Sequence, residues 1–449
     1  MPYSTGAAVT DRRPTLSHQA LQDRMDVLAR VHRVPGAQLV VDTGAQVLSV
    51  HTGTADAVAG TPFTADTAVP LGSVTKVYTA AAVMLLAEDG DLDPDDPAVE
   101  FLPELREVPE VTVRHLLSHT GGLPTGPDSD TAAGTTASRY LSTVCTARDA
   151  LFAPGTGFSY SNAGYVAAGR LVEAVTGMPW QEAVRVLLLE PLGTVPAFLG
   201  DTRSARPVAA GHALNTASGR VRPAHQNLAP VEAPAGALLA SALDLVELGR
   251  ALSGRSAVPA PATAARMRRP EPGAGPSVLA DAWGLGLALF RQDGRWWYGH
   301  DGNAQGTSCH LRVEPDSGTA VAFTGNSGGA TALWRDLAED ITRITGVRVP
   351  IAPAPADRGA PVSLPGCAGT YRNGPLEYRI EAGADGSPTL SVDGDSPVPL
   401  VCYPDLSCDL VDPATGRREP GGRFHRDPAT GVIDRVQISG RTARRTGTA

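Results

Sequence analysis

Lysine is almost absent from this chain. Its 449 residues contain 38 lysines and arginines, and every one of these except Lys76 is arginine. A guanidinium stays charged at any usable pH, whereas a desolvated ammonium can lose its proton and act as a base. Lys76 lies three residues after Ser73, so a catalytic base beside a nucleophile is one interpretation. The other interpretation is that codon usage favours arginine and left one lysine by chance at a surface site. The remaining motifs decide between the two.

Other scarcities exclude whole classes of protein. The cysteines number five, an odd count without any CxxC pair, which is typical of incidental thiols in a reducing compartment. His, Cys, Asp and Glu form no cluster with metal-ligand spacing, so we expect no metal and no cofactor. There is no apolar run of membrane-spanning length and no secretory leader pattern, which predicts a cytoplasmic protein without membrane contact. The net charge of −9 argues against nucleic acid as a partner.

The length predicts two domains, and the first is of the α+β class. Helical periodicity covers Leu16–His32, Val74–Asp89, Ala163–Thr176, Pro234–Leu252 and Ala332–Ile344, and a helix starts within Val111–Ser118. Strand patterns cover Ala37–Val41, Gln46–His51, Gly284–Phe290, Trp296–Gly299, Ser308–Val313 and Thr319–Thr324. Strands therefore come from both ends of the segment, which predicts one antiparallel sheet flanked by helices, with a helical insert, over residues 1–350.

A second, all-β domain is predicted after a linker. Residues 351–361 are rich in proline and alanine, which is typical of a linker. Short strand candidates then recur at regular spacing between Gly, Asp and Pro, over 362–449. They are Thr370–Arg372, Leu376–Glu381, Thr389–Val392, Val398–Tyr403, Ser407–Val411 and Val432–Ser439. This pattern indicates a small antiparallel barrel or sandwich.

Ser73 and Lys76 stand at the predicted start of the second helix. Side chains at i and i+3 share a helix face, so the hydroxyl and the amine can meet. The positive end of the helix and desolvation both lower a lysine pKa and favour a neutral amine that can take the serine proton. The Ser-x-x-Lys pattern alone is weakly specific.

Two further elements carry candidate chemistry. In Phe158–Ala163, Tyr160 could shuttle a proton to a leaving group and Asn162 could hold the lysine and a substrate amide; a core tyrosine and a helix-capping asparagine are the plain alternative. In Gly299–Asn303, a strand edge could offer a backbone N–H to an oxyanion and His300 could polarise the site. A simple turn is the alternative for that stretch.

In this order and at these separations, the three elements resemble the serine β-lactamase and penicillin-binding-protein superfamily, in its class C-like branch. The resemblance spans about residues 15 to 346. Supporting stretches similar to that family are Val111–Pro124, Pro154–Gly155, Ala235–Leu238 and Trp283–Leu287. It implies Ser73 as the acylated nucleophile, Lys76 as its base, Tyr160 as the proton shuttle, Asn162 as a contact to substrate and lysine, and His300 where many members carry lysine.

The resemblance also implies an oxyanion hole made by the N–H groups of Ser73 and Asn303, with Gly302 and Asp301 as further oxyanion or substrate-binding residues. This sequence departs from the family pattern at two positions. Asp301 replaces the Thr or Ser that is common between the Lys/His and the Gly. Ala288 stands where carboxypeptidases of this type often carry an arginine for a free substrate carboxylate, although Arg291 is near. His119 lies in the family-like stretch Val111–Pro124, and a structural role is the better interpretation of this residue.

Absence of a leader disfavours a cell-wall D-alanyl-D-alanine carboxypeptidase or a β-lactamase. Together with a lipocalin-like C-terminal barrel, the chain most closely resembles penicillin-binding-protein-type thioesterases. This resemblance implies a stand-alone enzyme that releases and macrocyclises a nonribosomal peptide with a D-residue at its acyl end. The substrate would arrive on the phosphopantetheine arm of a peptidyl carrier protein. A cytoplasmic esterase or transacylase on a small ester, and an acylated sensor without turnover, are the alternatives. We expect a Lys76→Arg variant to lose acylation and to fold almost as well as the wild type.

Overall fold

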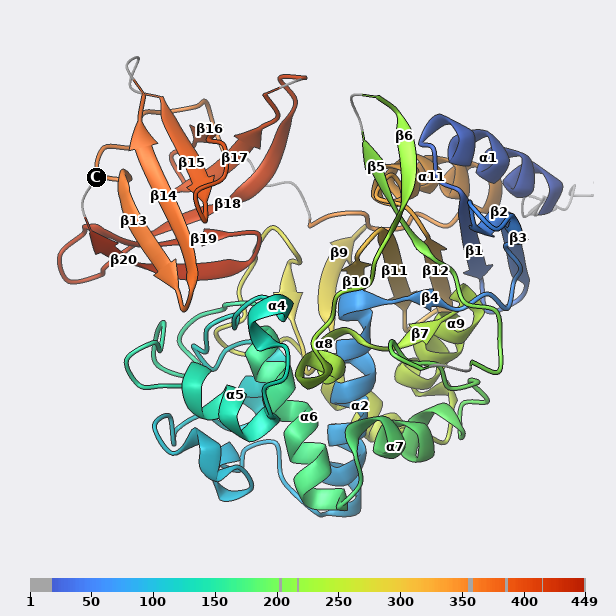
Figure 1. Ribbon diagram of the computed structural model, residues 1–449, viewed down its shortest axis with the longest axis horizontal. Coiled ribbons are helices and arrows are strands. Elements are labelled where there is room, and N and C mark those ends of the chain that lie inside the picture. Colours follow the sequence, from blue (N-terminus) through green and yellow to red (C-terminus); the bar gives the residue numbers. More distant parts are fainter. Residues whose placement is uncertain are drawn as a thin grey trace, which may run out of the picture.

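A single antiparallel sheet organises the first domain. The computed structural model describes residues 18–201, 204–215, 218–353, 358–383, 387–413 and 415–447. Within them, eight strands pair in the order β3-β2-β1-β12-β11-β10-β9-β8 (Figure 1). Their bounds are β1 Gly36–Asp42, β2 Val47–Asp56, β3 Thr61–Pro62, β8 Ala282–Trp283, β9 Ala288–Gln292, β10 Arg295–Ala304, β11 Thr307–Glu314 and β12 Thr319–Gly325. Because β1 pairs with β12, the two ends of the segment meet in the middle of the sheet, and the predicted α+β class is confirmed.

Helices cover both faces of this sheet. β1 alternates its side chains: Leu39 and Val41 pack with Trp334 of α11, while Val40 belongs to the core on the other face. Helices α1 His18–Val31 and α11 Ala330–Thr345 lie on the first face. The second face carries the larger helical part, with α2 Thr75–Asp89, α3 Val113–Ser118, α4 Ser129–Ala132, α5 Ala137–Val144, α6 Asn162–Thr176, α7 Trp180–Val184, α8 Ala233–Gly236, α9 Ala242–Arg250 and α10 Pro261–Met267.

Helix α2 is the central helix of the second layer. Its residues from Thr75 to Leu86 are all buried, and it contacts both α6 and α8. A helix that is apolar on every side must be surrounded by other elements. Gly90 ends α2 with a left-handed φ of 83°, which glycine adopts without strain. The start of α2 is therefore fixed firmly between the sheet and the helical layer.

The C-terminal domain is a closed barrel of eight strands within the described residues after 358. It fits a lipocalin-like domain, as predicted. The strands are β13 Gly369–Asn373, β14 Leu376–Ala382, β15 Pro388–Val392, β16 Val398–Cys402, β17 Ser407–Val411, β18 Arg418–Arg426, β19 Ile433–Ile438 and β20 Arg441–Gly447. Two of them, β18 and β20, are missing from the sequence prediction, because Gly and Pro interrupt β18 and β20 is mostly polar.

Two other predictions about elements are wrong in detail, and one hairpin was missed. The helix expected over Pro234–Leu252 is two helices, since the β7 strand Leu239–Ala240 pairs with β4 Val69–Pro70 and Ser241 caps a new helix. The strand expected over Gly284–Phe290 is broken at Gly286, where φ is 82°. The hairpin β5 Gly211–Asn215 and β6 Arg220–Ala224 was not predicted. The start of the helix expected at Leu16 and part of the expected linker lie outside the described residues.

None of the described helices is long and apolar enough to cross a membrane.

Candidate active site

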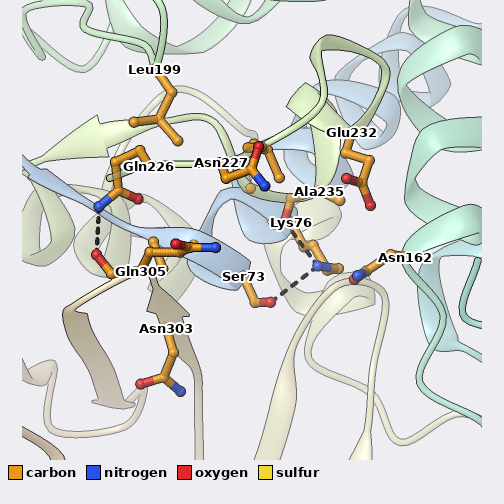
Figure 2. Close-up of a pocket in the computed structure, with 14 residues that line it drawn as sticks. Ser73, Lys76, Asn162, Leu199, Gln226, Asn227, Glu232, Ala235, Asn303 and Gln305 are labelled. Atoms are coloured by element: carbon orange, nitrogen blue, oxygen red, sulfur yellow. Dashed lines mark hydrogen bonds between the residues drawn. The ribbon is translucent and has the colours of Figure 1, made fainter. Parts of the chain in front are cut away.

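Ser73 and Lys76 meet at the start of α2. Ser73 lies in the short helix η1, Gly72–Val74, one turn before Lys76. The Lys76 Nζ lies 3.2 Å from the Ser73 Oγ and donates a hydrogen bond of 2.8 Å to the carbonyl oxygen of Ala235. Figure 2 shows both interactions at the floor of a cleft. The second bond holds the amine beside the hydroxyl, so the pair is arranged for proton transfer from serine to lysine.

Two glycines allow β10 to contact the turn that carries Ser73. Gly72 has a φ of 52°, and a Cβ there would lie 2.2 Å from the carbonyl oxygen of Asn303. A Cβ on Gly302 would lie 2.1 Å from the carbonyl oxygen of Leu71 and 2.8 Å from the backbone nitrogen of Val74. A side chain at either position would push β10 away. The close approach brings the backbone of Ser73 beside that of Asn303, as an oxyanion hole between them requires.

Lys76 is buried, and its pKa is shifted accordingly. Its exposed fraction is 1%, and the Nζ lies 5.1 Å from the ring centre of Tyr160 and 5.7 Å from that of Tyr165. Burial, together with the positive charge of Arg441, lowers the pKa of Lys76 to about 7, although the carboxylate of Glu232 opposes the shift. A substantial fraction of the amine is therefore neutral near pH 7, which arginine could not achieve.

Tyr160 lies in the turn before α6, and Asn162 is the first residue of that helix. Burial raises the pKa of Tyr160 to about 12, although the positive charge of Arg441 opposes this shift. The Tyr160 hydroxyl makes no hydrogen bond to any described residue, and neither does the Asn162 Oδ1. Ser161 is the helix N-cap, and its Oγ accepts a hydrogen bond from the Gly164 N–H. The capping role therefore falls to Ser161, which leaves the Asn162 side chain in the cleft.

His119 positions this turn. Its Nδ1 accepts a 3.1 Å hydrogen bond from the Ser161 N–H, and its ring centre lies 4.3 Å from that of Tyr160. Burial, reinforced by the charge of Lys76, lowers the pKa of His119 well below its usual range. The imidazole is therefore neutral, as its acceptor role requires. The structural role predicted for His119 is the one its contacts support.

His300 lies on β10 with 2% of its surface exposed. Its ring centre is 6.2 Å from that of Tyr160. Burial, together with the charge of Lys76, lowers the pKa of His300 to about 4. The Nδ1 lies 2.6 Å from the Asp301 carbonyl oxygen, which can only accept, so this nitrogen carries the proton. His300 therefore enters the site as a neutral ring whose Nε2 is an acceptor, where a lysine would place a charge.

Asp301 differs from its predicted role. Its carboxylate accepts hydrogen bonds from Arg312 at 2.7 and 2.9 Å and contacts the His310 Nδ1 at 2.7 Å. Desolvation alone would raise the pKa of Asp301, but the charges of Arg312 and His310 outweigh it and lower the pKa. Because the guanidinium of Arg312 is fully buried, it needs this anion. Asp301 therefore stabilises the sheet, and it does not line the cleft; the substrate contact predicted for it is not supported.

Gly302 and Asn303 contribute through the backbone. Gly302 provides the close approach to η1 described above and is not one of the residues that line the cleft. Asn303 does line the cleft, and Figure 2 shows its side chain turned away from Ser73. The backbone N–H of Asn303, rather than its side chain, is therefore the group that fits the predicted oxyanion role.

The C-terminal barrel contacts the turn that carries Tyr160. The Tyr160 N–H donates a 2.9 Å hydrogen bond to the Gly440 carbonyl oxygen, from the turn between β19 and β20. Arg441 lies 5.3 Å from the Tyr160 ring centre. Asn373 of β13 accepts from the Thr125 N–H at 2.7 Å and donates to the Thr442 carbonyl oxygen at 2.7 Å. The barrel thus supports the catalytic turn directly, which the sequence did not reveal.

The cleft above Ser73 has a volume of about 240 Å³. Besides the residues already described, four polar residues line it: Gln226, Asn227, Glu232 and Gln305. Gln226 donates a 2.6 Å hydrogen bond to the Gln305 carbonyl oxygen across the rim. Lys76 is the one cation among the described residues that line the cleft. Sequence reasoning missed Glu232 and Arg441, although Glu232 stands just before the family-like Ala235–Leu238.

Ala288 is buried, and the nearby Arg291 does not replace the arginine that related carboxypeptidases use to bind a free substrate carboxylate. The Arg291 guanidinium packs 4.5 Å from the ring centre of Trp296, and Arg291 is not among the residues that line the cleft.

No group of three or more His, Cys, Asp or Glu side chains that could hold a metal ion is found among the residues that the structure describes.

The acylation rate will depend on pH through Lys76. With a pKa of about 7, the amine is neutral above that pH and charged below it, so acylation falls about tenfold per pH unit well below 7. Arg441→Gln removes a positive charge, raises the pKa of Lys76 and moves the pH profile to higher pH. The rate at which an activated ester acylates the protein, followed between about pH 5.5 and 9, measures both profiles. A profile that is flat in the wild type would contradict the assignment of the base.

The fold and the arrangement of the site are those of the class of serine hydrolases. The beta-lactamase family model matches residues 19–344, and the chain belongs to this family of serine hydrolases. Penicillin-binding protein 4 of Amycolatopsis lactamdurans is 33% identical over 370 residues, which are 79% of this chain and 97% of that protein.

Solved structures extend the similarity to the barrel. The crystal structure of SurE has a TM-score of 0.84 and 38% identity, covering 96% of this chain and 99% of SurE. SurE has also been solved with D-Leu, with a TM-score of 0.82 and 36% identity, over the same shares of the two chains. The D-amino acid amidase of Ochrobactrum anthropi SV3 with D-phenylalanine has a TM-score of 0.62 and 26% identity, over 72% of this chain and 98% of the amidase.

Proposed function

We propose that this protein is a stand-alone thioesterase that releases a nonribosomal peptide from a carrier-bound thioester and closes it into a macrocycle. The acyl residue of the peptide has the D-configuration. A peptidyl carrier protein delivers the substrate on its phosphopantetheine arm, and the protein acts in the cytoplasm. The catalytic residues are Ser73, Lys76, Tyr160, Asn162 and His300.

The similarity to SurE over both domains, including a structure of SurE with D-Leu, carries this proposal. The D-amino acid amidase supports the same acyl configuration by its name, although its structures contain L-phenylalanine as well as D-phenylalanine. Because the barrel contacts the Tyr160 turn, a relative that shares both domains is more informative than one that shares the catalytic domain alone. The family resemblance to penicillin-binding-protein-type thioesterases then supplies the reaction type.

In this mechanism Ser73 Oγ attacks the thioester carbonyl while its proton passes to the neutral Lys76 amine. The oxyanion is stabilised by the N–H groups of Ser73 and Asn303. Collapse breaks the C–S bond, and the thiolate takes a proton through Tyr160. The peptide's own amine then attacks the ester carbonyl, forms the amide bond and returns the serine hydroxyl.

A hydrolase of the carboxypeptidase or β-lactamase type is the second candidate, favoured by the similarity to a penicillin-binding protein. Among the described residues that line the cleft, Lys76 is the one cation, and it is occupied with Ser73 and Ala235. A free substrate carboxylate would therefore find no guanidinium there. This observation disfavours a carboxypeptidase more than it disfavours a thioesterase.

The test uses a peptidyl thioester that ends in a D-residue and its L-epimer. We expect a cyclic product from the D-epimer, with a preference of at least about tenfold in kcat/KM, and mass spectrometry of products and intact protein measures it. Absence of acylation by either epimer would refute the proposal. Fast turnover of nitrocefin would instead identify a β-lactamase.

A further inference from the structure

Glu232 is an acidic side chain that the mechanism above leaves unused. It is the last residue of the short helix η5, Pro230–Glu232, and its exposed fraction is 4%. It lines the cleft together with Ser73, Lys76 and Asn162. Figure 2 shows its carboxylate on the same side of the cleft as the Lys76 amine and the Asn162 side chain. An anion is therefore built into the wall beside the nucleophile.

This carboxylate has a hydrogen-bond donor but no ion-pair partner. Its Oε2 accepts a hydrogen bond from the Ser129 hydroxyl. Among the described residues no arginine, lysine or histidine forms a salt bridge with Glu232, whereas most other buried carboxylates of the chain, such as Glu271 with Arg114, have one. Burial raises the pKa of Glu232, although the Ser129 hydrogen bond and the Lys76 charge oppose this. A buried anion without a cation is unfavourable unless a ligand supplies one.

A second acceptor lines the same cleft. The Asn162 Oδ1 is buried and makes no hydrogen bond to any described residue. A carboxylate and an amide oxygen can only accept, so together they suit a ligand group that donates several hydrogen bonds and carries positive charge. A primary ammonium has this chemistry, and water or an alcohol lacks the charge.

We propose that Glu232 and Asn162 form the subsite for the primary amine that attacks the acyl-enzyme on Ser73. This inference rests on the proposed function, because an enzyme that only hydrolyses needs no amine subsite. The bound ammonium transfers one proton to the Glu232 carboxylate and becomes a nucleophile. Its nitrogen then bonds to the ester carbonyl carbon, and the bond from that carbon to Ser73 Oγ breaks. The second amine proton passes through Lys76 to the serine oxygen, and Glu232 later releases its proton to solvent.

A structural role is the competing explanation, since Glu232 ties η5 to Ser129 at the start of α4. Glu232→Gln separates the two roles, because glutamine keeps the size and an oxygen that accepts from Ser129 but loses the charge. Ser129→Ala keeps the charge but removes the tie. Glu104→Gln is the control for loss of a glutamate charge elsewhere, since Glu104 has a buried carboxylate oxygen, pairs with Arg170 at 3.8 Å and is not one of the residues that line the cleft.

The experiment gives each variant a D-acyl thioester with ethylamine, ethanol or water as the acceptor. It is run at about pH 9, well above the titration of Lys76, because loss of the Glu232 charge lowers the pKa of Lys76. We expect Glu232→Gln to release thiol within about threefold of the wild type. The ratio of ethylamide to free acid falls at least about tenfold, whereas the yield of ethyl ester is unchanged. Ser129→Ala and Glu104→Gln keep the wild-type ratio.

An unchanged ratio of ethylamide to acid in Glu232→Gln would overturn the subsite. An equal fall in Glu232→Gln and Ser129→Ala, or an equal loss of ester and amide, would also overturn it, because either result indicates a structural role. The proposed function has a separate readout: it fails if the wild type releases no thiol from the D-acyl thioester. A wild type that releases thiol and a Glu232→Gln variant without change would refute the subsite alone.

Discussion

A Ser73→Ala variant will form no acyl-enzyme and will lose at least about 10³-fold in the rate of thiol release. Among the described residues that line the cleft, Ser73 has the one side chain that hydrogen-bonds to the buried Lys76 amine, at 3.2 Å, and no other described residue is placed to replace it. Mass spectrometry of the intact protein after incubation with a D-acyl thioester measures the covalent adduct directly.

The fold of this variant should be preserved. Lys76 keeps its 2.8 Å hydrogen bond to the Ala235 carbonyl oxygen, so the loss of one further bond changes the free energy of unfolding by about 1 kcal/mol. Ser253→Ala, on the helical turn Ala251–Arg255 that follows α9, is the control that should acylate normally. A Ser73→Ala enzyme with full activity would refute the assignment of the whole site.

Lys76→Arg will also lower the rate of acylation, by about 10²- to 10⁴-fold, because a guanidinium cannot take the serine proton at any usable pH. The structure revises the expectation that this variant folds normally. Lys76 is 1% exposed and relies on partial deprotonation, with its pKa lowered to about 7. An arginine there would bury a permanent charge and a larger side chain, which we expect to cost roughly 2–4 kcal/mol of stability.

Lys76→Met separates the two effects. Methionine fills most of the same space without a charge, so the variant should be inactive but at least as stable as the wild type, and chemical denaturation measures the difference. An acylating Lys76→Arg enzyme would mean that the single lysine reflects codon usage and not catalysis. A Lys76→Met variant less stable than Lys76→Arg would show that burial of the charge is not the reason for the loss.

Much of the catalytic centre follows from local sequence. A hydroxyl and an amine at positions i and i+3 of a helix start must lie near each other, whatever the rest of the chain does. The strand pattern from Ser308 to Thr324 and the helix from Val74 to Asp89 are likewise local signals, and the structure contains β11, β12 and α2 there. The α+β class and an all-β C-terminal domain could therefore be predicted from period and spacing, whereas closure of that domain into a barrel and not a sandwich was implied only by the family resemblance.

Errors arose where the local signal was weak or where it competed with distant partners. The pattern over Pro234–Leu252 is helical, but Leu239–Ala240 pair with Val69–Pro70 and interrupt it. Strand β20 is polar, and it forms because β13 and β19 satisfy its backbone. Asp301 occupies a motif position, but its carboxylate accepts hydrogen bonds from the buried guanidinium of Arg312 and does not face the cleft.

By itself, the sequence of this protein determined the pairing of a candidate nucleophile with a candidate base, because a single helical turn places Ser73 beside Lys76. The tertiary structure alone decided the pKa of that base, since burial of Lys76 and the charge of Arg441, 365 residues away, both depend on long-range packing. It also decided that the barrel supports Tyr160 and that Glu232 faces the cleft. These contacts join segments far apart in the chain, and no short-range pattern encodes them.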